Sequence, residues 1–91
     1  MSKFTKTPRE RIYQAIEKER NRQDQKWGFP QRNTLPEWGI ILSEEVGEAI
    51  TEINDAHFRS KPQDQLIREL IQVAAVSVSI IEHISMPVDE D

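Results

Sequence analysis

The sequence contains three helix-start motifs, and these motifs constrain the fold more than any other feature. In a capping box, a Ser or Thr hydroxyl accepts a hydrogen bond from the third helical N–H, and a Glu or Gln at that position bonds back to the cap. The matching segments are Thr7-Pro8-Arg9-Glu10, Thr34-Leu35-Pro36-Glu37 and Ser60-Lys61-Pro62-Gln63. Each has a proline in the first turn, where a missing N–H costs little. The motifs predict an all-α chain with helices over 8–25, 35–59 and 61–85.

The connections between these helices predict a single domain over residues 1–91. Residues 27–33 contain glycine, proline and asparagine without an alternating apolar pattern, so we expect a loop there. Almost nothing separates the second and third helices around Ser60, which predicts an antiparallel hairpin. Residues 1–7 and 86–91 are expected to be flexible ends.

The third predicted helix indicates a partner subunit. Twelve of the 20 residues from 65 to 84 are apolar, and they occupy nearly every side of the helix. Such a helix must be enclosed on several sides, and two other helices, one of them mostly charged, cannot easily cover it. We therefore expect a homo-oligomer, a dimer or a tetramer, in which two hairpins pair into a four-helix bundle.

Charge and composition exclude several classes of protein. The net charge is −4, but residues 1–26 carry +4 and residues 27–91 carry −8. A chain with its cations confined to one segment is a poor general nucleic-acid binder. The absence of cysteine excludes disulfides and fits a cytoplasmic protein. The apolar stretch 66–84 contains Arg68, Glu69 and Glu82, so we expect a buried helix and no membrane partner.

Carboxylates border the apolar faces of the second and third helices. At 100° per residue, Glu45 and Glu48 lie at the edge of the apolar stripe of the second helix, and Glu44 lies farther round. Glu69 and Gln72 lie among Leu, Ile and Val on the third helix. In an antiparallel hairpin these groups can converge. Hard oxygen ligands without nitrogen or sulfur favour Mg²⁺, with Mn²⁺ as the alternative.

The same carboxylates can also be explained without a metal site. Glu-x-x-Glu on a helix is usually a solvated face, and Glu69 could pair with Arg59 of the hairpin or with Arg68 of another subunit. Burial of an ionisable group within an apolar stripe nevertheless favours a functional site. His57 and His83 have no partner at metal-ligand spacing and are expected on helix surfaces.

Several segments in order resemble one family. Glu44-Glu45-Val46-Gly47-Glu48 is followed, after 20 residues, by Glu69-Leu70-Ile71-Gln72. This pattern resembles the Glu-Glu-x-x-Glu and Glu-x-x-Asp signature of the MazG-like all-α nucleoside triphosphate pyrophosphohydrolases. Gln23 to Gly28 resembles the lead-in of small phage and bacterial members, and Trp27 to Asn33 resembles the related dCTP pyrophosphatases.

The resemblance implies hydrolysis of a nucleoside triphosphate to the monophosphate and pyrophosphate. It also implies Mg²⁺ held by Glu45, Glu48, Glu69 and Gln72. Glu44 neighbours these ligands and is the candidate general base, with a salt bridge beside the ligands as the alternative. Gln72 departs from the family pattern because it occupies the Asp position. Its amide oxygen can still ligate a cation, but one negative charge is lost, so metal affinity should fall or one metal should be absent.

Five residues are candidates for binding the nucleotide. Trp27 lies in the predicted loop and is suited to stack on a base, whereas Trp38 is expected as core or pocket wall. Lys26 and Arg32 could contact phosphates or be solvated loop charges. Asn33 could bond a base edge or simply precede the Thr34 cap.

Two other functions compete with hydrolysis. A non-catalytic helical dimerisation or partner-binding protein that retains the MazG-like fold is favoured by Gln72. A small acidic DNA mimic or antitoxin-like protein is disfavoured, since Glu69 lies in the most apolar helix instead of on an exposed face.

Overall fold

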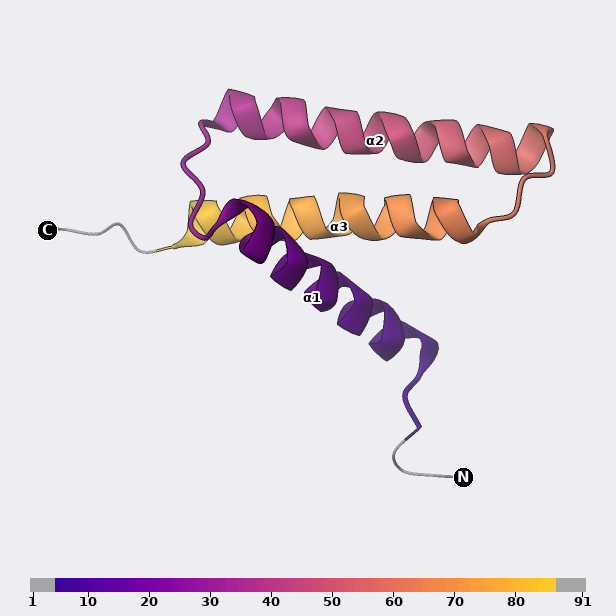
Figure 1. The fold of residues 1–91 in the computed structure, drawn as a ribbon, viewed down its shortest axis with the longest axis horizontal. Helices are drawn as coiled ribbons and strands as arrows, with labels where there is room; N and C mark the ends of the chain where they lie inside the picture. Colours follow the sequence, from indigo (N-terminus) through magenta and orange to yellow (C-terminus); the bar gives the residue numbers. More distant parts are fainter. Residues whose placement is uncertain (1–4, 87–91) are drawn as a thin grey trace, which may run out of the picture.

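The computed structural model describes residues 5–86 and contains three helices, with no strand in that range. They are α1 (Pro8–Trp27), α2 (Leu35–Phe58) and α3 (Asp64–Ser85) (Figure 1). The all-α prediction is confirmed, and both hydrogen bonds of the predicted capping boxes at Thr7 and Thr34 are present. Most of the predicted flexible ends, residues 1–4 and 87–91, lie outside the described residues.

The third capping box was predicted wrongly, because α3 begins at Asp64 instead of residue 61. An N-cap residue needs extended backbone angles, whereas Ser60 has φ 52° in the left-handed region. The next residue is held by α2: the Lys61 N–H donates to the Asp55 carbonyl over 3.3 Å, and Lys61 Nζ lies 2.8 and 3.0 Å from the two Glu52 carboxylate oxygens. These residues reverse the chain direction, so they cannot also start a helix.

The helix α3 is the element against which both other helices pack. It runs antiparallel beside α2, as the short connection predicts, and α1 crosses it obliquely (Figure 1). Within residues 5–86, α1 and α2 do not pack against each other. The segment Gly28–Thr34, called the 28–34 segment below, joins α1 to α2 near the C-terminal end of α3. Gly28 ends α1 with φ 82°, a conformation that favours glycine.

A buried arginine attaches α1 to α3. Arg20 is 3% exposed, and its Nε donates to a Glu82 carboxylate oxygen of α3 over 2.8 Å. The same guanidinium donates to Asp24 over 2.9 Å and to Gln23 over 3.1 Å. A buried charge is tolerated when it is paired and hydrogen-bonded in this way. The contact fixes the end of α1 that carries Gln23 and Trp27.

The chain buries few apolar side chains by itself. The buried apolar residues are Trp38, Ala49, Ala75 and Val76, whereas many large ones are exposed. The accessible surface is 7398 Å², against about 5500 Å² for a monomeric protein of this mass. The radius of gyration is 15.9 Å, against about 12 Å for a compact domain of this length.

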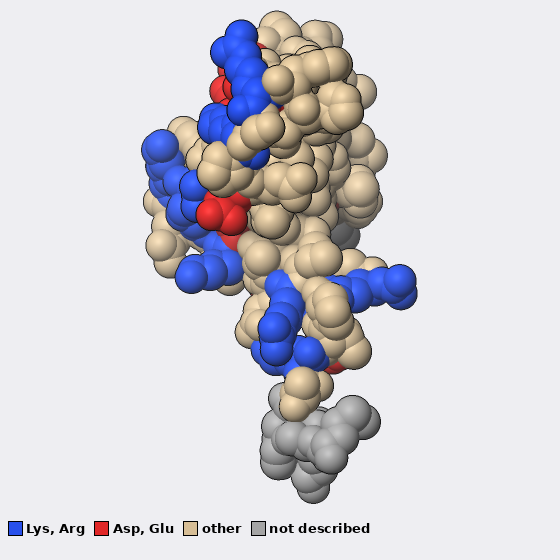
Figure 2. Space-filling view, turned by 90° about the vertical axis from the view of Figure 1, so that its right-hand side faces the viewer, with Lys and Arg blue, Asp and Glu red and all other residues tan. Residues whose placement is uncertain are grey.

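Charged side chains are unevenly distributed over the surface. In Figure 2, Lys and Arg side chains gather on the lower part of the molecule, where α1 begins, and along one edge above it. A broad area at the level of the α2–α3 hairpin carries no charged side chain in this view. No helix in the described part of the chain combines the length and the hydropathy that a membrane crossing needs.

Candidate metal centre and adjoining pocket

Three carboxylates from two helices converge on one point. Glu45 and Glu48 lie one turn apart on α2, and Glu69 lies on the facing part of α3. One oxygen of each lies within 4.8 Å of one oxygen of each of the others. The convergence expected from the antiparallel hairpin is therefore present, because residues three apart on a helix share a face.

The carboxylates of this cluster are only partly satisfied by the protein. Glu69 is 8% exposed, and its Oε1 accepts a hydrogen bond from Gln65 Nε2 over 2.7 Å. Glu69 Oε2 and Glu45 Oε2 are buried without a hydrogen-bond partner. The alternative pairing with Arg59 is not formed, since Arg59 pairs with Asp55 of α2. Across residues 5–86, no Lys or Arg pairs with the three carboxylates.

Mutual repulsion makes the ionised cluster unfavourable. Burial raises the pKa of Glu45, and the neighbouring charges of Glu48 and Glu69 raise it further. The pKa of Glu48 is also raised, first because its protonated form can donate a hydrogen bond to Glu69 and then because of the charge of Glu69. A divalent cation would reverse both effects. The buried oxygens without partners and the all-oxygen donor set both fit Mg²⁺ or Mn²⁺.

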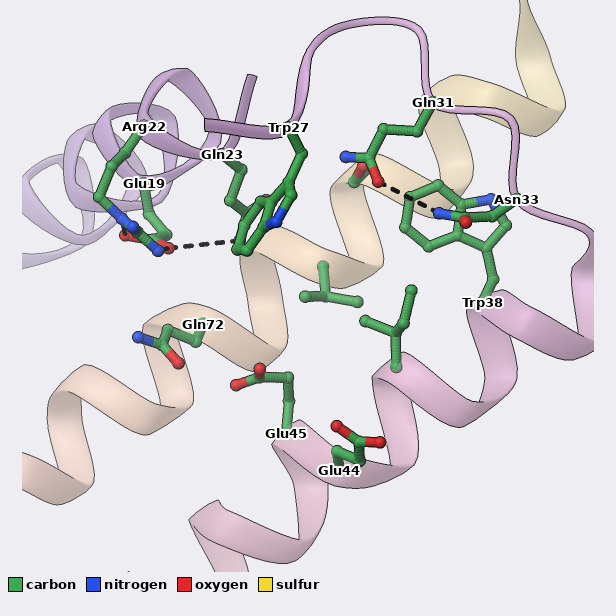
Figure 3. A pocket seen from close by; sticks show the side chains of 13 residues that line it. Glu19, Arg22, Gln23, Trp27, Gln31, Asn33, Trp38, Glu44, Glu45 and Gln72 are labelled. Carbon is green, nitrogen blue, oxygen red and sulfur yellow. Dashed lines mark hydrogen bonds and ion pairs between the residues drawn. The ribbon is translucent and has the colours of Figure 1, made fainter. Parts of the chain in front are cut away.

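A pocket of about 390 Å³ adjoins the cluster, between the end of α1, the start of α2 and the second half of α3 (Figure 3). Glu44, Glu45 and Gln72 lie at one end of it, and Gln31, Asn33 and Trp38 lie at the other. Glu19, Arg22, Gln23, Trp27, Ile41, Val76 and Ser79 complete the lining. Aromatic faces, amides and carboxylates therefore share one cavity.

The candidate nucleotide-binding residues separate into two groups. Trp27, Asn33 and the buried Trp38 line the pocket, with Trp27 56% exposed at its mouth. Lys26 and Arg32 do not line it. The Lys26 ammonium lies 4.7 Å from the centroid of the Trp27 ring, and Arg32 is exposed.

The candidate base and the candidate fourth ligand both reach this pocket. Glu44 is exposed and lines the pocket beside Glu45. Gln72 is half-buried on α3 and lines the same cavity. Figure 3 shows its amide between the Glu45 carboxylate and the Arg22 and Glu19 side chains of α1.

Trp27, predicted in a loop, is the last residue of α1, and three further residues of this helix that were not predicted also line the pocket: Glu19, Arg22 and Gln23. Arg22 forms two hydrogen bonds to the Glu19 carboxylate, of 2.9 and 2.7 Å, and Gln23 is buried beside them. These residues are spaced by three and four positions on one helix face, a signal that the sequence does contain. Ser79 was also missed, although its hydroxyl is buried without a partner in the pocket lining.

The surface position predicted for His83 is wrong. His83 is half-buried, contacts the rings of Phe29 and Trp38, and bonds to the 28–34 segment. Its partner Gln31 is 52 residues away in the chain, so no local pattern could reveal the contact. His57 is exposed at the end of α2, as expected.

Comparisons of the chain with protein-family models, curated proteins and solved structures found no match.

Proposed function

We propose that this protein is a Mg²⁺-dependent nucleoside triphosphate pyrophosphohydrolase of the MazG-like type. It would convert a ribo- or deoxyribonucleoside triphosphate and water to the monophosphate and pyrophosphate. The observation that carries the proposal is the pair of buried, unpartnered carboxylate oxygens of Glu45 and Glu69 beside a pocket walled by two tryptophans. The first feature suits a cation, and the second suits a nucleoside.

The proposed reaction assigns a role to each end of the pocket. Glu45, Glu48 and Glu69 would hold the cation, and Gln72 would contribute a neutral oxygen. When bound there, Mg²⁺ would offset the charge of the triphosphate and make the attacking water easier to deprotonate. Glu44 accepts a proton from the attacking water. The water oxygen bonds to the α-phosphorus as the bond from that phosphorus to the β-phosphate bridging oxygen breaks, and pyrophosphate leaves.

The other end of the pocket suits a nucleoside. Trp27 and Trp38 offer aromatic faces, and stacking on a base is a common use of such faces. Asn33 Nδ2 donates to Gln31 Oε1 over 3.1 Å, which leaves one amide NH₂ and one amide C=O available in the pair. If the O and N atoms of both amides are exchanged, Gln31 donates to Asn33, and one NH₂ and one C=O are again free, now on Asn33 and Gln31 respectively. The pair can therefore meet a base edge that carries both a donor and an acceptor.

The proposed function is tested by incubating the purified protein with a panel of ribo- and deoxyribonucleoside triphosphates and Mg²⁺. The expected products are nucleoside monophosphate and pyrophosphate in equal amounts, and chelation of the metal should stop the reaction. Release of orthophosphate and diphosphate would indicate cleavage at the γ-phosphorus and would contradict the assignment. No release from any triphosphate would favour the non-catalytic alternative.

We also propose that a second copy of the chain covers the exposed apolar face of the hairpin, giving a four-helix bundle. Large apolar side chains are exposed along both hairpin helices, including Ile40 and Ile50 of α2 and Leu70, Ile81 and Ile84 of α3. The chain exposes 7398 Å², roughly 1900 Å² more than a folded monomer of this size. A specific interface buries about 800 Å² on each partner, so this excess is more than enough to supply one.

The dimer is tested by light scattering, which should give about twice the 10.6 kDa chain mass. Ile81→Glu should yield monomers, because it places a charge in the covered face where the side chain is 62% exposed in the single chain. Ile12→Glu is the matched control on α1, where the isoleucine is 50% exposed, and it should leave the mass unchanged. A well-folded wild-type monomer at micromolar concentration would contradict the dimer, and a fourfold mass would indicate a tetramer.

The competing function is a non-catalytic dimerisation or partner-binding protein. The neutral Gln72 and the exposed apolar face favour it. It differs from the enzyme in one measurable respect, since the dimer would form while Mg²⁺ and nucleotides would have no effect. We place either protein in the cytoplasm, without a nucleic-acid or membrane partner.

A further inference from the structure

His83 connects the 28–34 segment to α3. Its Nε2 accepts a hydrogen bond from the backbone N–H of Gln31 over 2.9 Å, and its Nδ1 lies 2.6 Å from the Ser79 carbonyl oxygen. Its ring lies between two aromatic rings, with centroid distances of 5.1 Å to Phe29 and 5.0 Å to Trp38. The side chain therefore contacts the segment, α2 and its own helix.

These two hydrogen bonds require one form of the imidazole. A backbone N–H can only donate, so Nε2 must be unprotonated to accept from Gln31. A backbone carbonyl can only accept, so Nδ1 must carry the proton and donate to Ser79. Only the neutral Nδ1–H tautomer satisfies both partners. The two hydrogen bonds thus define the protonation and the tautomer of the His83 ring without reference to any ligand.

The same contact positions residues that line the pocket. Gln31 and Asn33 of the segment and Trp38 of α2 form the end of the pocket remote from the carboxylates. Other hydrogen bonds of the segment in the described chain remain within it or lead to α1 and α2: Gly28 donates to Asp24, and Thr34 exchanges bonds with Glu37. Among residues 5–86, the hydrogen bond that joins the 28–34 segment to α3 is thus the one accepted by His83.

We propose that His83, in its neutral Nδ1–H form, is a positioning residue that holds the 28–34 segment as a wall of the pocket and thereby determines how tightly the base of a nucleotide binds. The identity of the ligand rests on the proposed function. The positioning of the segment does not, because it follows from hydrogen bonds within the chain.

Nuclear magnetic resonance tests the positioning without any nucleotide. In a ¹⁵N-labelled protein at alkaline pH, the ring of His83 should show the Nδ1–H tautomer, whereas the exposed His57 serves as the internal reference. The Gln31 amide should exchange with solvent at least about ten times more slowly in the wild type than in His83→Phe, the factor expected for about 1.4 kcal/mol of local stability. An Nε2–H tautomer, or equal exchange in the two proteins, would overturn the proposal.

Two variants separate hydrogen bonding from packing. His83→Phe keeps an aromatic ring between Phe29 and Trp38 but cannot accept from Gln31. His83→Gln offers a carbonyl oxygen near the position of Nε2 and should restore part of the Gln31 protection. His57→Phe is the matched control, since His57 contacts Phe58 edge to face, is exposed and does not line the pocket. Circular dichroism establishes that each variant is folded, and rescue by His83→Gln keeps the test valid if His83→Phe unfolds.

Ligand binding tests the consequence for the pocket. We expect His83→Phe to raise the Kd for nucleoside monophosphates, measured by tryptophan fluorescence, about tenfold, the effect of one lost positioning hydrogen bond. The KM for the triphosphate should rise similarly while kcat changes less than about threefold, since the reacting end of the pocket is untouched. Equal fluorescence titrations for wild type and His83→Phe would overturn the role in binding.

The two proposals fail in different ways. If the wild type binds and hydrolyses no nucleotide, the proposed function is wrong, and the role assigned to His83 in base binding is wrong with it. The tautomer and the Gln31 exchange rate then still decide whether His83 positions the segment. If nucleotides are hydrolysed but the Gln31 amide exchanges equally fast in His83→Phe, the enzyme stands and the positioning role is wrong.

Discussion

Replacement of Glu45 by glutamine is expected to reduce Mg²⁺-dependent pyrophosphate release at least about 100-fold and, at the same time, to raise the melting temperature of the metal-free protein. Activity falls because the cation loses a charged ligand. Stability rises because Glu45 lies within 4.8 Å of two other carboxylates and has a buried oxygen without a partner. A neutral amide removes that repulsion. Glu69→Gln should behave in the same way.

The stabilisation by Glu45→Gln should depend on pH. Because burial and the charges of Glu48 and Glu69 raise the pKa of Glu45, ionising this residue is less favourable in the folded chain than in the unfolded one. Below the pKa that Glu45 has in the unfolded chain, the protonated residue therefore contributes its full stability to the fold. This contribution is lost as pH rises through the higher pKa of Glu45 in the folded chain. The wild type resembles the glutamine variant when Glu45 is protonated, so the difference in melting temperature should be larger at neutral pH than near pH 4.

Glu52→Gln is the matched control for this experiment. Glu52 lies on the same helix, but both of its carboxylate oxygens accept from Lys61, outside the cluster. This variant should keep its pyrophosphatase activity, and its melting temperature should fall, because the Glu52 side chain is only 14% exposed and loses its ion pair with Lys61. Near-wild-type turnover by Glu45→Gln would contradict the metal site. A metal-free melting temperature of Glu45→Gln below that of the wild type would contradict the repulsion among the three carboxylates.

Local sequence patterns predicted the parts of the fold that depend on neighbouring residues. The capping boxes at Thr7 and Thr34 mark the starts of α1 and α2, since a box needs only a hydroxyl and a carboxylate three residues apart and an N-cap residue that is free to adopt extended angles. The segment from Ser60 to Gln63 matches the same Ser/Thr-x-x-Glu/Gln pattern, but Ser60 has left-handed backbone angles in the hairpin turn. Tertiary demands on the turn therefore override the local motif.

Helical spacing and a short connection were likewise sufficient to predict the carboxylate cluster. Glu45 and Glu48 share a face of one helix, and an antiparallel hairpin brings that face to Glu69. The remote end of the pocket could not be predicted, because it depends on how α1 crosses α3 and on the path of the 28–34 segment. The bonds from Arg20 to Glu82 and from Gln31 to His83 span 62 and 52 residues, and no sequence period encodes such pairs.

Gln72→Asp should tighten Mg²⁺ binding while destabilising the metal-free protein. Gln72 lines the pocket with Glu45, and under the proposed MazG-like function it would stand where an aspartate is expected. A fourth carboxylate adds repulsion without the cation and attraction with it. If the residue is instead a half-buried helix position with no metal contact, a new charge should lower stability equally under both conditions.

Thermal melts with and without Mg²⁺ distinguish these two roles of Gln72, because a ligand stabilises a fold according to its affinity for the native state. A tenfold gain in affinity adds about 1.4 kcal/mol at saturating Mg²⁺, which corresponds to a further rise of roughly 5 to 10 °C for a domain of this size. Gln14→Asp, at an exposed position of α1, is the matched control and should show the wild-type response. Equal Mg²⁺-induced rises in the melting temperatures of wild type and Gln72→Asp would remove Gln72 from the metal centre. No rise in either protein would favour the non-catalytic function, since the three carboxylates would then cluster without binding a cation.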